Sequence, residues 1–354
     1  MNRSTWTHFA LLGTALAAAY YSWSSEDTLV TDEGVVIVST EASDLSVVKY
    51  ESKDKRLTMT FKTDAQGDYI WIDSVEVKQS TKPKAPPTTE GSDEADAPET
   101  AETDTQASPE PVVTEELKSF KAGSAGQGLI EKLAPFTAKR ELADVAPEGL
   151  AALGLAEPEG TLTLERKDKT PVVVEVGGEA YGTRDRYVRD SSNGRIYIVA
   201  ADVLRPMDHA NTRLPDRDLL ASKQPELVRL LIETATGSAE FEQRNRDDRK
   251  AAYWARVDAE AEDAVATGWL DRFFRLRSRG YVQVDETPTG LEPQFTVKTI
   301  DENGASIALQ ILSGNNENGQ PSFYAKSDHT RELVKLDKTL ATETTEDLGA
   351  VLND

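Results

Sequence analysis

Cysteine is absent from this 354-residue sequence, and that absence excludes a group of structures and chemistries. The chain can form no disulfide, no thiolate nucleophile, no cysteine-ligated zinc site and no iron–sulfur cluster. It also lacks the cysteine that carries the lipid of a bacterial lipoprotein. Histidine is nearly as scarce, with three residues at His8, His209 and His329, so metal binding and acid–base catalysis have few side chains available. We therefore expect no metal, no cofactor and no enzymatic activity.

Positive charge is also in deficit. The chain carries 40 lysines and arginines against 62 aspartates and glutamates, a formal net charge of −22. Such a field repels nucleic acid, which excludes a nucleic-acid partner. Hydrophobic residues make up 38% of the chain, enough to build a core, and 354 residues correspond to roughly two folded units.

One apolar run is long enough to span a membrane, and it lies at the N-terminus. From Thr5 to Trp23 it covers about 19 residues, roughly 28 Å as a helix, which matches a thin bilayer. Arg3 precedes the run and acidic residues follow it from Glu26, so the N-terminus is expected in the cytoplasm. We expect residues 1–25 to be a single-pass inner-membrane anchor, with the body in the periplasm or otherwise outside the cytoplasm. A cleaved signal peptide and a buried helix of a soluble protein are the open alternatives.

The body divides by composition. Residues 79–116 are rich in proline, threonine and carboxylates without an apolar period, which predicts an acidic, disordered insert. The segments around it show the alternation of half-buried strands. The expected division is 1–25 anchor, 29–78 first part of repeat 1, 79–116 insert, 117–218 remainder of repeat 1, and 219–345 repeat 2.

Two short helices and many short strands are predicted along the body. The helices are expected at Leu129–Ala138 and Trp269–Arg277. The strands are expected at Val35–Ser39, Ser46–Glu51, Leu57–Lys62, Tyr69–Glu76, Leu162–Arg166, Val172–Val176, Arg186–Asp190, Arg195–Val199, Leu227–Thr234, Ser238–Arg244, Tyr253–Val257, Phe295–Ile300, Ile307–Leu312, Ser322–Lys326 and Glu332–Leu336.

The order of these segments occurs twice, with residue-level echoes. Asp44–Val48 resembles Glu226–Leu230, and Tyr69-Ile70-Trp71 resembles Ala252-Tyr253-Trp254, at offsets of about 182 and 183. The offset falls to about 136 where Gly154–Pro158 resembles Gly290–Pro293, and the acidic insert lies in that interval. A duplication with an insertion in the first copy explains both observations. The expected fold class is α+β, two tandem β-rich repeats with short helices, preceded by one N-terminal transmembrane helix.

Several segments together resemble the bacterial family of domains of unknown function numbered 4340. They are Ala42-Ser43-Asp44-Leu45, the connection from Leu150 to Pro158, Val174-Glu175-Val176-Gly177, Tyr187-Val188-Arg189, Ile196–Val199 and the turn from Leu214 to Leu220. The resemblance extends over nearly the whole chain after the anchor, except the insert. Members are typically membrane-anchored, and some lie beside ABC-type export or gliding-motility components. The resemblance therefore implies an accessory role at the cell envelope and supplies no catalytic residues.

Two segments invite a chemical interpretation. Gly123–Gly128 precedes a predicted helix as a phosphate loop does, but it lacks the Gly-Lys-Ser/Thr ending, and no strand is predicted to lead into it. We expect it only to free the start of the helix. His209 stands near Asp216 and Asp218, a set that suits a metal or a hydrolase, but the same acidic residues are ordinary in a turn between repeats.

Arg272, Arg275 and Arg279 form the most basic patch of the sequence and are its candidate partner surface. The competing interpretation is an amphipathic helix whose aromatic residues enter the core while the arginines meet the protein's own carboxylates. Trp71 and Trp254 occupy matching repeat positions, where repeated core anchors are expected rather than carbohydrate-stacking platforms.

These observations predict a non-catalytic, membrane-anchored, extracytoplasmic interaction or accessory protein, associated with an ABC-type transport or secretion system. Its expected partners are proteins of the cell envelope. The first alternative is a periplasmic sugar- or peptide-binding module with a cleft between the repeats. The second is a hydrolase that uses His209 with Asp216 or Asp218.

Overall fold

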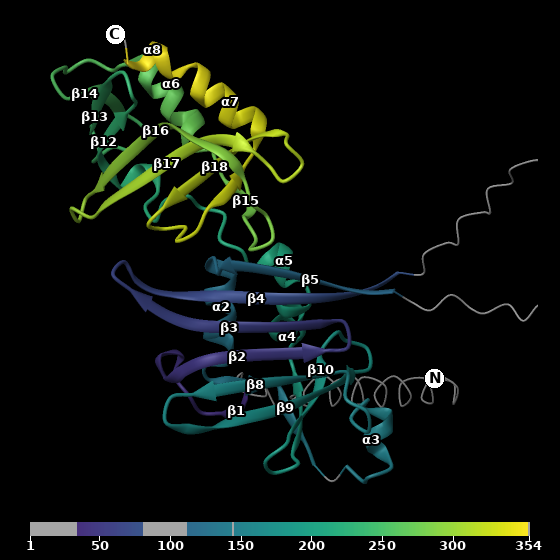
Figure 1. Cartoon of the computed structure of the whole chain (residues 1–354). Helices are drawn as coiled ribbons and strands as arrows, with labels where there is room; N and C mark the ends of the chain where they lie inside the picture. The colour runs from purple at the N-terminus through teal and green to yellow at the C-terminus, as the bar shows by residue number, and fades with distance from the viewer. Residues whose placement is uncertain (1–33, 81–111, 144, 353–354) are drawn as a thin grey trace, which may run out of the picture.

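The structure is a computed structural model that describes residues 34–80, 112–143 and 145–352 (Figure 1). The expected anchor at 1–25 and most of the expected insert lie outside the described residues. None of the described helices has both the length and the apolar character that crossing a bilayer requires. The body is mostly β-sheet with a few short helices, as the α+β expectation has it.

The first half of the body is built on a nine-stranded antiparallel sheet with the order β5-β4-β3-β2-β8-β9-β10-β11-β7. Its strands are β2 (Leu45–Ser52), β3 (Lys55–Asp64), β4 (Gly67–Ser80), β5 (Val112–Lys121), β7 (Arg140–Leu142), β8 (Gly160–Arg166), β9 (Lys169–Glu179), β10 (Arg186–Asp190) and β11 (Ile196–Val199). A separate two-stranded sheet pairs β1 (Val35–Val38) with β6 (Phe136–Ala138).

The second half is built on an eight-stranded antiparallel sheet with the order β14-β13-β12-β16-β17-β18-β19-β15. Its strands are β12 (Leu227–Glu233), β13 (Ser238–Arg244), β14 (Tyr253–Arg256), β15 (Ser278–Tyr281), β16 (Thr289–Asp301), β17 (Ser306–Asn315), β18 (Pro321–Ser327) and β19 (Val334–Leu336). Residues 214–223, which we call the connector, join the two halves.

Short helices cover one face of each sheet. In the first half they are α2 (Ser124–Leu133), α4 (Ala201–Asp208) and α5 (Ala210–Arg213), with α3 (Gly149–Ala152) in the connection before β8. In the second half they are α6 (Ala264–Phe273), α7 (Lys338–Glu346) and α8 (Leu348–Leu352). Short 3-10 turns, η1 (Ala42–Asp44) and η2 (Gln224–Glu226), precede β2 and β12. Apolar side chains of the helices and strands form the core, which the connector continues from one half to the other.

The two sheets follow the same strand order. In each, three strands (β2–β4 or β12–β14) lead to a helix (α2 or α6) and then to a strand at the opposite edge (β7 or β15). Four more strands (β8–β11 or β16–β19) complete the sheet, and helices follow them. The first half alone adds β5, outside β4. The first two pairs of echoed segments therefore fall in equivalent places, at β2 and β12 and on β4 and β14, whereas Gly154–Pro158 lies in the turn before β8 and Gly290–Pro293 lies within β16. Strand β5 lies in the interval where the offset changes.

The strand prediction around Leu57 is confirmed. Leu57 and Met59 are buried in β3, while Thr58 and Thr60, which follow them, are partly exposed, as alternation predicts. The helices begin earlier than predicted: α2 starts at Ser124 rather than Leu129, and α6 at Ala264 rather than Trp269. Asp263 explains the early start of α6, because its side chain accepts a hydrogen bond from the backbone of Ala266 and caps the helix.

The insert was predicted too wide at both ends. Strand β4 continues to Ser80, and β5 begins at Val112, both inside the range 79–116. The carboxylates of β5 do not indicate an unfolded segment, because they form ion pairs with basic residues of the sheet. Glu115 pairs with Arg56 of β3 at 2.7 Å, and Glu116 pairs with Lys118 at 2.8 Å and also with Lys78 of β4. Cross-strand pairing of opposite charges makes acidic residues compatible with a strand.

Candidate functional site

The two halves meet where the edge strand β5 of the first sheet approaches the edge strand β15 of the second (Figure 1). The backbone N–H of Ser119 donates to Gln283 Oε1 at 2.6 Å, and Gln283 Nε2 donates back to the Ser119 carbonyl at 3.3 Å. The connector lies alongside the end of β5, where Ala122 pairs with Pro215. The joint is therefore made of backbone hydrogen bonds as well as side-chain packing.

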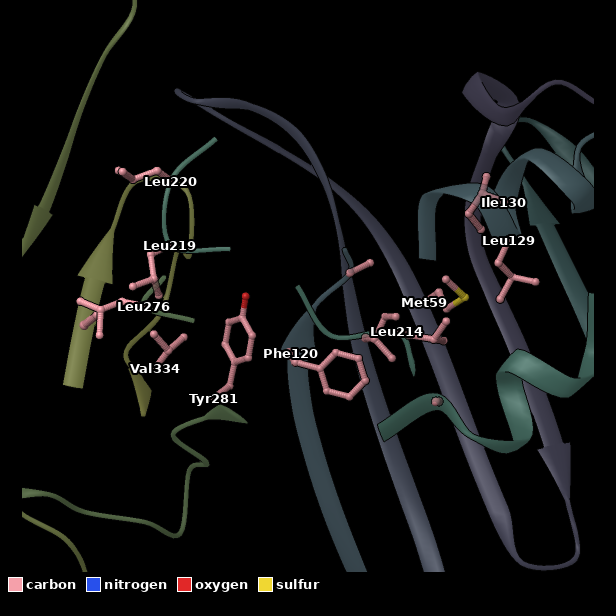
Figure 2. Packing of buried hydrophobic residues seen from close by; sticks show 14 of the residues in the cluster. Met59, Phe120, Leu129, Ile130, Leu214, Leu219, Leu220, Leu276, Tyr281 and Val334 are labelled. Atoms are coloured by element: carbon pink, nitrogen blue, oxygen red, sulfur yellow. The ribbon is translucent and has the colours of Figure 1, made fainter. Parts of the chain in front are cut away.

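Apolar packing also runs continuously through the joint. Figure 2 shows Phe120 and Leu214 between two groups of buried side chains. On one side are residues of the first half, and on the other are residues of the second half and of the connector. These are Met59, Leu129 and Ile130 on the first side, and Leu219, Leu220, Leu276, Tyr281 and Val334 on the other. The halves thus share one core at their contact, although each has its own sheet.

Gly123 allows the connector to pass close to the start of α2. A Cβ atom at Gly123 would lie 3.0 Å from Asp216 Cα and 3.2 Å from its backbone nitrogen. The backbone N–H of Gly123 donates to the Leu214 carbonyl at 2.8 Å, so the protein itself uses this donor. Strand β5 leads directly into this glycine segment, contrary to the prediction. Gly123 therefore allows two chain segments to cross closely, and we assign it no phosphate-binding role.

A buried charged cluster lies at this crossing and takes one side chain from each of three segments. Asp216 of the connector accepts from Lys121 Nζ of β5 at 2.7 Å and from His329 Nε2, after β18, at 2.9 Å. Its second carboxylate oxygen accepts from the backbone N–H of Asp218 at 3.0 Å. Lys121 and Asp216 are 7% and 9% exposed. The cluster therefore joins both halves and the connector through one buried carboxylate.

Asp216 is held in its ionised form. Burial alone would raise the pKa of its carboxyl group, but the hydrogen bonds from His329 and Lys121 and the charge of Lys121 outweigh burial and lower the pKa to about 2. The paired charges thus satisfy the carboxylate that the fold has removed from water. An ionised, fully hydrogen-bonded carboxylate of this kind orders the joint and is a poor proton donor near neutral pH.

Tyr281 of β15 lies beside this cluster. Its ring meets that of Trp71 of β4 edge to face, with the centroids 5.8 Å apart. Burial, together with the negative charge of Asp216, raises the pKa of Tyr281 well above its ordinary value. The hydroxyl approaches the Lys121 backbone but forms no well-made hydrogen bond with any described residue. A buried hydroxyl without a partner is unusual, since buried polar groups are normally satisfied.

A cavity of about 200 Å³ opens between the halves at this point. Its walls come from β5, from α5 and the connector, from β15 and the loop after it, and from β19. The residues that line it are Lys118, Phe120, Asn211, Pro215, Arg217, Ser278, Arg279, Gly280, Tyr281, Gln283, Glu286 and Lys335. The cavity thus lies between the two halves, where the binding cleft between the repeats was predicted. Tyr281 forms part of its wall.

Comparison with known proteins places the chain in a family. A family model described as a domain of unknown function (DUF4340) matches residues 113–291, about half of the chain. The chain belongs to the DUF4340 family. No curated protein and no solved structure matches it.

The DUF4340 match covers only part of the candidate site. It runs from β5 into β16, so it contains Lys121, Asp216 and Tyr281 but not His329. The match also begins after the Ala42–Leu45 segment. The sequence suggested a resemblance over nearly the whole chain, and the family model matches the central part of it.

The three residues of the hydrolase hypothesis do not form one site among the described residues of this DUF4340 protein. His209, at the end of α4, lines a cavity with Tyr50 and Asp208. Asp216 instead pairs with His329, and Asp218 pairs with Arg277 at 3.2 Å. Among the described residues, no hydrogen bond or ion pair links His209 to either aspartate. The described part of the chain likewise contains no cluster of three His, Asp or Glu side chains that could hold a metal ion.

The predicted arginine surface is largely engaged with the protein's own carboxylates. Arg272 pairs with Asp347, and Arg279 pairs with Asp337 at 2.7 Å. Arg275 is exposed and forms no ion pair with the described residues. Trp269 and Phe273 of the same helix are buried and stack on each other at 5.3 Å. The amphipathic-helix interpretation holds for Arg272 on α6, whereas Arg275 follows the end of the helix and Arg279 is on β15, where it also reaches the cavity wall.

Sequence reasoning missed Lys121, Ser278 and Tyr281 as members of the site. It named His329 as one of three histidines but gave it no partner. A signal was present in the Leu214–Leu220 motif, where Asp216 stands between leucines that are both buried. A charged residue that is buried near apolar core residues needs a partner elsewhere in the fold.

Proposed function

We propose that this DUF4340 protein is a non-catalytic accessory protein, anchored in the membrane through residues 1–25 and acting outside the cytoplasm. Its body contacts a protein partner in an ABC-type transport or secretion system. The apolar run from Thr5 to Trp23 and the charge asymmetry around it support the anchor. The family resemblance supports the envelope role, and the shared strand order supports descent of the two halves from one duplicated unit.

The observation that carries the contact role is the outer edge of β5. Ser119 and Lys121 use their outward backbone groups to bond Gln283 and Asp216. Backbone groups of alternate residues point to the same edge of a strand, so those of Leu117 and Glu115 point outward as well. No described residue bonds these groups, and the Leu117 side chain is 51% exposed.

A free strand edge with an exposed apolar side chain accepts an extended segment of a partner by strand addition. The ribbon of β4 and β5 suits this contact, because it extends beyond β3. The pairing of β4 with β3 ends at Glu76, whereas its pairing with β5 continues to Ser80 (Figure 1). The partner strand would lie along Glu115 and Leu117, next to the segment that the second half already covers.

The test uses a proline that blocks this edge. Leu117→Pro removes an N–H that points away from β4, so the sheet keeps its own ladder, while strand addition loses a donor. Leu117→Thr keeps the N–H and is the matched control. A photo-reactive residue at the exposed position Thr114 reports the contact in cells that express the full chain.

We expect a covalent adduct with a transport or secretion protein in the membrane fraction, identified by mass spectrometry, and its loss in Leu117→Pro but not in Leu117→Thr. Equal adducts in both variants would reject the β5 edge as the contact. Recovery of the full chain in the cytosolic fraction would reject the anchored, extracytoplasmic role.

A second candidate function, binding of a small molecule between the halves, is favoured by the cavity at β15. Two of its lining side chains, Ser278 and Tyr281, are buried with hydroxyl groups that lack partners among the described residues. This candidate does not require a catalytic residue. Its test is whether the full chain gains thermal stability from any small polar molecule, and no gain from any of them would reject it.

A further inference from the structure

Unsatisfied polar atoms gather around the cavity between the halves. Ser278 and Tyr281 are 1% and 4% exposed, and both hydroxyl oxygens lack a hydrogen-bond partner among the described residues. Asn211 on α5 adds two further atoms, since both Oδ1 and Nδ2 are buried without a partner. All three residues line the cavity. A buried polar group left unpaired is costly, and a concentration of such groups at one cavity indicates a bound molecule that pairs with them.

The charge of the cavity is opposite to that of the protein. Four cationic residues line it, Lys118, Arg217, Arg279 and Lys335, against one carboxylate, Glu286. The whole chain has a net charge of −22, so this wall is a local exception. A positive wall in a recessed site attracts an anion.

Arg217 is the cation available to a ligand. Lys335 pairs with Glu286 at 2.6 Å, Arg279 with Asp337 at 2.7 Å, and Lys118 with Glu116 at 2.8 Å. Arg217 forms no ion pair with the described residues, and its one long hydrogen bond goes to the Thr212 carbonyl at 3.5 Å. A guanidinium group binds a carboxylate through two parallel hydrogen bonds.

The unpaired Asn211 atoms restrict the ligand further. Nδ2 donates and Oδ1 accepts, so the ligand must itself carry a donor in addition to its anionic group. Sulfate only accepts hydrogen bonds, and would leave Asn211 Oδ1 unpaired. A cavity of about 200 Å³ is also smaller than the roughly 300 Å³ at which pockets for drug-sized ligands begin.

We infer that this cavity binds a small hydroxycarboxylate, with the carboxylate on Arg217 and the hydroxyl group among Asn211 and Ser278. The inference rests on the second candidate function, small-molecule binding between the halves, and adds the chemical class of the ligand. It requires no covalent step. The Lys121–Asp216–His329 cluster lies close to Tyr281, which forms part of the cavity wall, but none of its three residues lines the cavity.

The experiment measures binding of malate, glycolate and citrate to the full chain in detergent by calorimetry and thermal shift. Sulfate, acetate and glycerol are the comparison probes, because they supply a strong anion without a hydroxyl donor, a carboxylate without a hydroxyl, and hydroxyls without charge. We expect saturable binding of at least one hydroxycarboxylate and binding at least about tenfold weaker for all three comparison probes, since each probe leaves Arg217 or a buried polar group unpaired, at a cost of roughly a factor of ten.

Two variants connect the binding to the cavity. Ser278→Ala removes a hydroxyl that bonds nothing in the described fold, so we expect unchanged unfolding with hydroxycarboxylate affinity lower by about tenfold. Arg217→Ala is expected to abolish the preference for anions. Arg275→Ala is the matched control, since this arginine is exposed and lies outside the cavity lining, and it should leave the affinity unchanged.

The outcomes distinguish the proposed ligand class from the more general proposal of small-molecule binding between the halves. Binding of sulfate, acetate or glycerol without binding of any hydroxycarboxylate would overturn the ligand class and leave small-molecule binding in place. Binding of none of the six probes, with no gain in thermal stability, would overturn both. Hydroxycarboxylate binding that survives Arg217→Ala and Ser278→Ala unchanged would overturn the assignment to this cavity.

Discussion

The two halves of the body share a strand order but differ at one edge. In the first half β4 is covered by the additional strand β5, whereas the equivalent strand β14 is bonded by a loop of its own half, in which the Asp263 N–H donates to the Trp254 carbonyl at 3.0 Å. The additional strand is the one that meets the second half, through Ser119 and Lys121. The strand that the first half adds therefore supplies one side of the joint, and its Lys118 and Phe120 form part of the cavity wall.

The tryptophans of the two halves show how small a difference separates a core residue from a joint residue. Met59 and Ile72 are opposite each other and buried, so Trp71, next to Ile72, points to the other face of the first sheet. Trp254 pairs with Gln243, which lies on the same face as the buried Phe241. A slip of one residue in register reverses the face. Trp254 is in the core as predicted, and Trp71 is only partly buried, against Tyr281 of the second half.

The largest effect on the joint is expected from Asp216→Ala. The substitution leaves Lys121 buried without its partner, and breaking a buried ion pair on one side costs about 3–5 kcal/mol. Urea unfolding at pH 7 measures the loss. We expect the two halves to unfold in separate steps in this variant, because the cluster is their main charged connection.

Two controls accompany that substitution. Asp218→Ala removes an exposed ion pair with Arg277 and should cost less than about 1 kcal/mol. Replacing both members of the buried pair, Lys121→Met with Asp216→Leu, should recover much of the stability that Asp216→Ala loses, since no charge is then left unpaired. An equal loss for Asp216→Ala and Asp218→Ala would contradict the importance of the buried cluster.

The same carboxylate gives the joint a pH dependence. The pKa of Asp216 falls from its ordinary 3.8 to about 2 in the folded protein. A lowered pKa contributes stability that is present above 3.8 and is lost as the pH falls toward 2, about 2 kcal/mol in all. The free energy of unfolding, measured from pH 6 to pH 2, should therefore fall more steeply for the natural chain than for Asp216→Asn. Parallel curves for the two chains would refute this contribution.

A smaller effect on stability is expected at Gly123, which precedes α2, and at Gly128, which lies within it. Gly123→Ala places a Cβ 3.0 Å from Asp216 Cα, and crowding against backbone costs about 1–3 kcal/mol. Gly128→Ala is the matched control in the same helix, because a Cβ there meets nothing within 4 Å. It should stabilise the chain by about 0.5–1 kcal/mol. Thermal unfolding of both variants measures the difference, and two changes of the same sign would argue against the close crossing.

Much of the fold could be predicted because its strands alternate. The predicted limits Arg186–Asp190 and Ser238–Arg244 coincide with β10 and β13. Three short strands were missed: β7 and β15 have three and four residues, and β6 lies at the end of the range predicted as the helix Leu129–Ala138. The start of α2 was misplaced because its first turn contains glycine and serine, while its buried Leu129, Ile130 and Leu133 all lie in the later turns.

The site was predictable only in part, because its members come together through the joint. Asp216 was selected for its nearness in sequence to His209, whereas the fold brings it to His329. Lys121 ends a strand that composition had assigned in part to the insert. No local pattern marks Ser278 or Tyr281, since their importance comes from burial without a partner. Contacts between distant segments depend on the arrangement of the halves, which periodicity does not encode.

The smallest change in stability is expected from a second contact between the halves, at the β3–β4 turn. Arg331 of the second half pairs with Asp64 at 2.7 Å, and its guanidinium lies 5.1 Å from the centre of the Tyr69 ring. Because Arg331 is largely buried against these groups, Arg331→Ala should cost about 1 kcal/mol, the range of a partly desolvated cation–π contact. Arg275→Ala, which removes an exposed arginine, should leave stability within about 0.5 kcal/mol. If the two variants unfold alike, the charged cluster at Asp216 and the packing around Phe120 hold the halves together without this contact.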